Sequence, residues 1–150
     1  SAAGRALGPE IGQLNGAFTY PSTGRTANQL ATLQHIGLFA SAIGDPSALT
    51  VYPKPFEGSM TPEKARSYLH ANCAGCHRPD GGAARSTMDL RFATPFASTN
   101  TCNATPILDN FGSPSNRLVK PGSPSESVVS LRMRSLDARR MPPLAKPKRR

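Results

Sequence analysis

The sequence contains no tryptophan, and aromatic residues make up only 6% of its 150 residues. All hydrophobic residues together reach 37%, which is low for a compact domain. In contrast, 15 prolines and 13 glycines predict short helices joined by much irregular chain. The length suits one domain rather than two. We expect so small a core to need a further source of buried apolar surface, such as a bound cofactor.

Acidic residues are also few: the sequence has nine Asp and Glu but 18 Lys and Arg. Its formal net charge is therefore +9. Residues 1–116 hold eight basic and seven acidic residues (net +1), whereas residues 117–150 hold ten and two (net +8). Such a basic segment attracts an acidic protein, an anionic membrane surface or nucleic acid. Because no recognition-helix, RRM or zinc-finger pattern is present, nucleic acid is the weakest of the three.

Three further features are missing from the sequence. No apolar run approaches the roughly 18 residues of a membrane helix, so we expect at most peripheral membrane contact. No signal-peptide pattern is present, and Ser1–Gly4 resembles a mature end or an excised segment. The three cysteines are an odd number, which excludes a simple disulfide framework.

Hydrophobic periodicity predicts a first helix over residues 26–43. Leu30, Leu33 and Ile36 recur on one face of this segment, and Thr26 is placed to cap its start. No strand is predicted anywhere, so we expect an all-α protein. An internal repeat is also absent from the sequence.

Two more helices are predicted further along the chain. Thr61, followed by Pro62, is a suitable cap for a helix that leads directly into Cys73. Residues 123–126, Ser-Pro-Ser-Glu, have the pattern of a capping box for a helix that ends near Arg134. We expect this last helix to bury Val128 and Leu131.

The predicted helices divide the chain into three parts. Residues 1–60 form an N-terminal extension that begins with a loop over residues 1–25. Residues 61–145 form the main domain, and residues 146–150 form a basic tail.

The most specific motif is Cys73-x-x-Cys76-His77. Two thiols three residues apart on a helical turn can add to the two vinyl groups of one porphyrin. His77 follows Cys73 by four residues, so its imidazole can approach the iron from the same side. The C-x-x-C-H pattern is a signature of c-type haem attachment.

Other interpretations of the cysteines fit less well. A thioredoxin-like motif would need a βαβ setting, which the sequence does not predict. A zinc site would need four convergent ligands, and the adjacent Cys76 and His77 make a single tetrahedral set awkward. Cys102 is left over, and we interpret it as a small buried hydrophobic residue.

The second axial ligand is predicted to be a methionine. Met141 lies 64 residues after His77, in a loop stiffened by two prolines, where it could hold its thioether over the far face of the haem. Met133 is expected to fill the core of the last helix, whereas Met60 and Met88 could touch the haem edge.

Histidine side chains are further candidates for the second axial ligand, and arginine side chains are candidates for contacts with the haem propionates. His35 would make a bis-histidine site if the first helix crossed the haem, whereas His70 lies on the same helix as the motif and should not reach the far face. Arg78, Arg85 and Arg91 could pair with haem propionates.

Five stretches form an ordered pattern over about residues 61–145: Tyr68–Pro79, Asp89–Arg91, Cys102–Asn103, Pro121–Ser127 and Arg140–Leu144. In this order they resemble class I-type bacterial cytochrome c domains, such as the modules of larger periplasmic proteins. The resemblance implies a cytochrome c-like fold of short helices around one covalent haem c. It also implies a site formed by Cys73, Cys76, His77 and Met141, with His77 and Met141 bound to the iron. Arg91 and Tyr68 are further candidate cofactor-binding residues.

The sequence departs from this pattern after Met141. Such domains usually continue into a C-terminal helix, whereas only Pro142–Arg150 follow here. We therefore expect the helix at 26–43 or a partner subunit to take its place, unless the chain shown is incomplete.

The resemblance implies electron transfer in the periplasm, or at the periplasmic face of a membrane complex, rather than catalysis. The basic end is expected to dock an acidic redox partner. A first alternative is a haem-bearing, largely structural subunit of a multi-protein redox assembly. A second is haem catalysis such as peroxide reduction, which would need an open sixth position.

Overall fold

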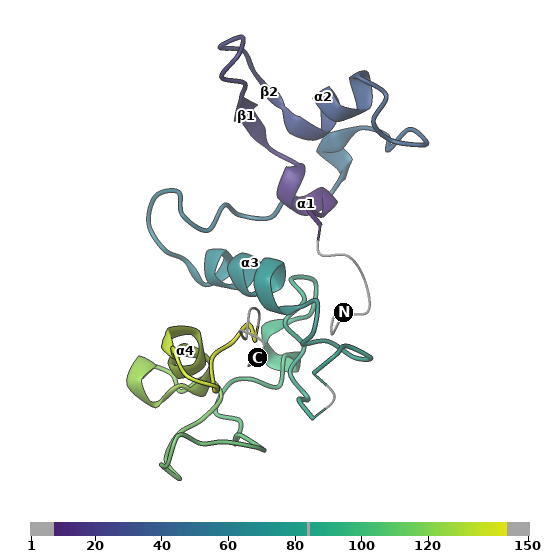
Figure 1. Ribbon diagram of the computed structural model, residues 1–150. Helices are drawn as coiled ribbons and strands as arrows, with labels where there is room; N and C mark the ends of the chain where they lie inside the picture. Colours follow the sequence, from purple (N-terminus) through teal and green to yellow (C-terminus); the bar gives the residue numbers. More distant parts are fainter. Residues whose placement is uncertain (1–7, 84, 144–150) are drawn as a thin grey trace, which may run out of the picture. The chain divides into compact units, whose positions relative to one another are not determined.

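The computed structural model describes residues 8–83 and 85–143. The chain divides into two compact units, an N-terminal unit of residues 6–68 and a C-terminal unit mainly of residues 69–150. Figure 1 labels the helices and strands of both units. The predicted domain boundary after residue 60 stays a prediction.

The expectation of an all-α fold is wrong. About 29% of the structure is helical and 7% is extended, and most of the chain is irregular. The strands are β1 (Ala17–Thr19) and β2 (Thr26–Asn28), which pair as a two-stranded antiparallel sheet. They lie in the segment predicted as loop and in the first residues of the predicted helix 26–43.

Local chemistry explains this sheet. Strand β1 contains Phe18 and Thr19, whose aromatic and β-branched side chains favour extended backbone. Thr19 pairs with Thr26, and their hydroxyl oxygens lie 2.8 Å apart. Gly24 closes the connecting turn with a φ of +66°, a conformation that glycine adopts at little cost.

The predicted helix 26–43 is reduced to α2 (Gln29–His35). Its cap is Asn28, whose side chain accepts a hydrogen bond from the Ala31 N–H at 3.2 Å. It ends in a Schellman motif, because Gly37 has a φ of +71° and the Leu38 N–H donates to the Leu33 carbonyl. Side chains beyond this point are therefore not on the helix, and Leu38 is 64% exposed.

The core of the N-terminal unit contains Leu30, which is fully buried, and a polar centre at Asn15. The Asn15 amide donates to the carbonyls of Pro46 and Leu49 at 2.8 and 3.0 Å, and its oxygen accepts from Asn28. Two short helices flank this centre, α1 (Ile11–Leu14) and the 3-10 helix η1 (Pro46–Ala48).

Helix α3 (Pro62–Cys73) runs across the division between the units. Its predicted cap is confirmed, because the Thr61 hydroxyl accepts a hydrogen bond of 3.3 Å from the Lys64 N–H. None of the helices in the described part of the chain has the length and apolar character of a membrane span.

Helix α4 (Val128–Arg134) begins later than predicted, after the 3-10 helix η3 (Pro124–Glu126). The capping box at Ser123 does not form, because the Glu126 carboxylate instead accepts from Lys120 at 2.8 Å. The backbone around Ser127 pairs with Arg117, which delays the first helical turn. The end at Arg134 and the burial of Val128 agree with the prediction, whereas Leu131 is only partly buried.

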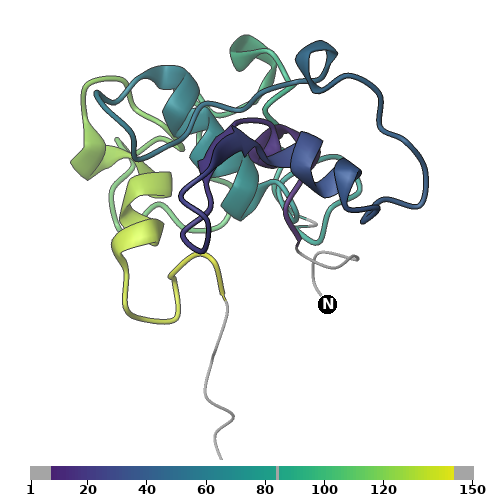
Figure 2. The same cartoon turned by 90° about the horizontal axis from the view of Figure 1, so that it is seen from above.

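The hydrophobic core of the C-terminal unit is small. It is formed by Ala74, Met88 and Leu90, with partly buried Cys73, Leu118 and Val129 against it. Another short helix of this unit is η2 (Phe96–Ser98). After α4 the chain turns back on itself, which is visible in Figure 2.

Candidate cofactor site

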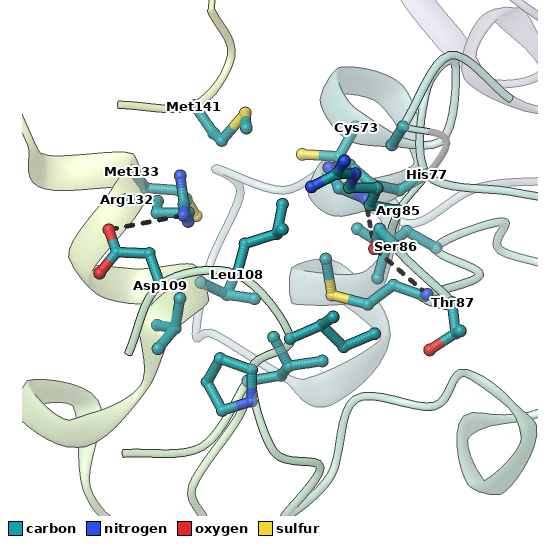
Figure 3. Close-up of a pocket in the computed structure, with 18 residues that line it drawn as sticks. Cys73, His77, Arg85, Ser86, Thr87, Leu108, Asp109, Arg132, Met133 and Met141 are labelled. Atoms are coloured by element: carbon teal, nitrogen blue, oxygen red, sulfur yellow. Dashed lines mark hydrogen bonds and ion pairs between the residues drawn. The ribbon is translucent and has the colours of Figure 1, made fainter. Parts of the chain in front are cut away.

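The C-terminal unit contains a cavity of about 330 Å³, within the range of roughly 300–1,000 Å³ that is usual for ligand sites. Cys73 and His77 line one side of it, and Met133 and Met141 line the opposite side (Figure 3). Most of the remaining wall is apolar, with Ala83, Met88, Leu90, Pro106, Ile107, Leu108, Leu118, Val128 and Val129. The sequence motif and the proline-stiffened methionine thus meet at one cavity.

The backbone of His77 is held on both sides. Its N–H donates to the carbonyl of Cys73, the last residue of α3, at 2.8 Å. Its carbonyl accepts from the Leu90 N–H at 2.9 Å. The imidazole is therefore presented from a rigid helix end that is joined to the core.

The His77 side chain is oriented by Ser86. Its Nδ1 lies 3.2 Å from the Ser86 hydroxyl, which also accepts a hydrogen bond from the Met88 N–H at 3.3 Å. This contact leaves Nε2 as the nitrogen available to a ligand. Metal-bound histidines usually use their second nitrogen in such a hydrogen bond.

Burial, and then the positive charge of Arg132, lowers the pKa of His77. A neutral imidazole, with a lone pair on one nitrogen, is the form that binds metal ions. The electrostatics of the cavity therefore favour the ligating form of His77.

The two motif thiols differ in position. Cys73 lines the cavity, whereas Cys76 is partly buried and is not among its described lining residues. Burial raises the pKa of the Cys73 thiol, and the neighbouring Cys76 raises it further. Cys102 is exposed, so its interpretation as a buried hydrophobic residue is wrong.

A tight loop follows the motif and returns to it. The Ala83 N–H donates to the Cys76 carbonyl at 3.2 Å, and the Gly81 N–H donates to the Arg78 carbonyl at 3.0 Å. A Cβ on Gly81 would overlap with the Cys76 carbonyl oxygen, so this approach needs glycine.

Met141 follows a loop that is tied to α4. The Met141 N–H donates to the carbonyl of Arg132 at 3.0 Å. The Arg132 guanidinium donates to the carbonyl of Arg139 at 2.9 Å. These two contacts hold the chain on either side of Arg140.

The other methionines have different environments. Met88 is buried in the core beside the cavity, and Met133, which was predicted as core, is 42% exposed and lines the cavity wall. Met60 is 67% exposed and is not among the described lining residues.

Neither remaining histidine is among the described residues that line the cavity. His35 is exposed at the end of α2, in the N-terminal unit. His70 is buried, and its Nδ1 accepts a hydrogen bond from the Phe92 N–H at 3.0 Å.

Of the three arginines and the tyrosine that were predicted at the site, only Arg85 is among the described residues that line the cavity. Arg85 lines the cavity, whereas Arg91 forms an ion pair of 2.6 Å with Asp89. This pairing holds the pKa of Asp89 at about 2. The Nε of Arg78 is buried without a hydrogen-bond partner among the described residues. Tyr68 packs edge-to-face against Phe56, with ring centroids 5.9 Å apart.

Ser86, Asp109 and Arg132 are among the residues of the site that were not predicted from the sequence. The Arg132 guanidinium and the Asp109 carboxylate lie 3.7 Å apart at the cavity wall. Their positions depend on contacts between distant segments, so no spacing in the sequence signals them. Ser86 could have been suspected only because it follows His77 by nine residues along the chain.

No three His, Cys, Asp or Glu side chains of the described residues converge as a metal site. The structure thus offers no preformed ligand set for zinc in this part of the chain. Comparison with protein-family models, with curated proteins and with solved structures found no match. The function is therefore inferred from the site itself.

Proposed function

We propose that this protein is an electron-transfer domain that carries one haem c bonded to Cys73 and Cys76. The observation that carries the proposal is the cavity, which has Cys73 and His77 on one side and Met141 on the other. A bound haem supplies one-electron cycling of its iron between Fe(II) and Fe(III). The protein acts as a carrier and makes no bond to a substrate.

The residues that line the cavity fit this cofactor. The apolar wall matches the porphyrin surface, and the small core formed by Ala74, Met88 and Leu90 leaves the unit in need of more buried apolar area. His77 offers a neutral imidazole, and Met141 offers a thioether on the far side. Ligation by histidine and methionine raises the reduction potential.

Ser86 orients His77, and the apolar residues around the cavity offer the porphyrin an apolar surface. Arg85 is the predicted propionate partner that lines this cavity. Arg91 is engaged by Asp89, so we assign it to holding the 89–94 segment rather than to the cofactor.

The location follows from the attachment chemistry, since the resemblance implies that haem is attached to C-x-x-C-H outside the bacterial cytoplasm. We place the domain in the periplasm or at the periplasmic face of a membrane complex. The basic end of the chain is proposed to dock an acidic redox partner. Residues 146–150 of this segment lie outside the described residues.

Absorption spectra of the ferric and ferrous protein, with a pyridine haemochrome assay, test the attachment. We expect one covalent haem per chain, and a preparation matured in a cytochrome c-competent host that lacks it would overturn the proposal. Met141→Ala should then convert the ferric spectrum to high spin. Met133→Ala is the matched control, because Met133 lines the same side of the cavity and should leave the low-spin spectrum unchanged.

Ionic strength tests the docking step. Association with an acidic redox partner should slow steeply as salt rises, because exposed charges are screened within about 10 Å at 0.1 M. A rate that does not change with salt would exclude electrostatic docking while leaving the haem assignment intact.

A second candidate is a haem-bearing subunit that is largely structural. The observation in its favour is the exposure of large apolar side chains in the C-terminal unit, where Leu136 is 93%, Ile107 66% and Leu108 64% exposed. Purification distinguishes the two functions. A stable haem-loaded monomer favours the free carrier, whereas aggregation or haem loss without partners favours the subunit.

A further inference from the structure

The loop that leads to Met141 is folded by one carboxylate. Asp137 accepts hydrogen bonds from the Ser135 hydroxyl at 2.6 Å and from the Arg139 N–H at 2.8 Å. Its second oxygen accepts from the Arg139 Nη2 at 2.7 Å. These contacts are local, so they shape the turn but do not determine where the turn lies.

Arg132 supplies the contacts that attach this turn to α4. Its carbonyl accepts from the Met141 N–H at 3.0 Å, and its guanidinium donates to the Arg139 carbonyl at 2.9 Å. One residue thus binds the loop at Met141 and two residues before it. Hydrogen bonds from a charged donor such as this guanidinium are stronger than neutral ones.

The Arg132 side chain is itself held by a second segment. Its guanidinium carbon lies 5.7 Å from the centroid of the Phe111 ring, and that of Arg139 lies 4.5 Å from the same ring. Asp109 is an ion-pair partner at 3.7 Å. Because the Arg132 side chain is only 21% exposed, its position is well defined by these neighbours.

We propose that Arg132 is the positioning residue that holds Met141 over the far side of the cofactor. It acts through the loop, because its guanidinium anchors the turn while its backbone anchors Met141. This inference rests on the proposed function, since it names the residue that keeps the second axial ligand in place.

Added imidazole, which competes with Met141 for the far axial position, provides the test in the haem-loaded full chain. In Arg132→Gln we expect imidazole to bind the ferric protein roughly ten- to a hundredfold more tightly, because the loop has lost a charge-assisted hydrogen bond. Arg132→Lys retains a charged donor and should recover part of this change. Arg132→Lys also keeps the positive charge that acts on His77, so the change that remains in this variant comes from the loop contact.

Arg134→Gln is the matched control. Arg134 belongs to the same helix and carries the same charge, but it donates to Ser130 and Pro124 rather than to the Met141 loop. Its imidazole affinity should stay within about twofold of the wild type, as expected for an exposed charge. An unchanged affinity in Arg132→Gln, or an equal change in Arg134→Gln, would overturn the proposal.

A second measurement separates this inference from the haem assignment. The rate of amide hydrogen exchange at Met141 measures how often the loop opens, and it can be measured with or without the cofactor. Exchange should be faster in Arg132→Gln than in the wild type or in Arg134→Gln. If Arg132→Gln does not yield folded protein, Arg132→Leu, which keeps an apolar stem, takes its place with the same expected and overturning results. Absence of haem from the wild type would contradict the proposed function, whereas unchanged Met141 exchange would contradict the role of Arg132.

Discussion

The imidazole Nδ1 of His70 accepts a hydrogen bond of 3.0 Å from the backbone N–H of Phe92. His70 is one helical turn before Cys73 and is only 8% exposed. A second bond joins the same two segments, because the Leu90 N–H donates to the His77 carbonyl. The two bonds set the position of the motif relative to residues 89–92.

Replacing His70 should therefore destabilise the C-terminal unit. His70→Ala removes a buried hydrogen bond, which we expect to cost about 1–3 kcal/mol in the free energy of unfolding, measured by urea denaturation. His70→Asn should lose less, since its side-chain oxygen can lie where Nδ1 does. His35→Ala, at an exposed position, is the control and should change stability by less than about 0.5 kcal/mol.

The lowered pKa of Asp89 predicts that the free energy of unfolding falls as the solution becomes acidic. The Arg91 hydrogen bonds lower its pKa from 3.8 to about 2, so the ionised carboxylate stabilises the folded state. This contribution is complete above the unfolded pKa and is lost as the pH falls from about 4 toward 2. Unfolding free energies measured over this range should converge for the wild type and Asp89→Asn.

At neutral pH, Asp89→Asn should be less stable by about 1–3 kcal/mol, because hydrogen bonds to Arg91 and Thr94 are weakened. Asp80→Asn is the control, because it makes the same change in charge at an exposed position. A constant difference between wild type and Asp89→Asn from pH 7 to 2 would contradict the assignment.

Gly81 is predicted to be required beside the motif. In Gly81→Ala the new methyl would overlap with the Cys76 carbonyl, so the loop must shift. We expect a loss of about 1–3 kcal/mol in unfolding free energy and a lower haem content per chain. Gly8→Ala is the control, since a Cβ there meets no atom within 4 Å.

Ser86 should influence the reduction potential if the proposed function holds. Its oxygen accepts from Nδ1 of an iron-bound His77, which makes the imidazole a better donor and favours the ferric state. Ser86→Ala should therefore raise the midpoint potential by roughly 20–60 mV, the equivalent of about 0.5–1.5 kcal/mol for one electron. Ser86→Thr keeps the hydroxyl and should restore the potential, and a lowered potential in Ser86→Ala would refute this role.

Features that depend on neighbouring residues could be predicted from the sequence. Thr61 and Pro62 start α3 because a cap and a first-turn proline act within one helical turn. The glycine that ends α2 is also visible in the sequence at Gly37, but the helix predicted from periodicity continues past it to residue 43. The pairing of β1 with β2 was missed because three-residue strands have almost no periodicity.

The chemistry proposed for the candidate site can be predicted from the sequence alone, since Cys73, Cys76 and His77 lie within five residues and their spacing carries the prediction. The surroundings of these residues are known only from the tertiary structure. The start of α4 depends on the pairing of Ser127 with Arg117, and the Met141 loop depends on Arg132. Such contacts join segments whose separation along the chain leaves no local pattern, so their geometry emerges only when the chain is packed.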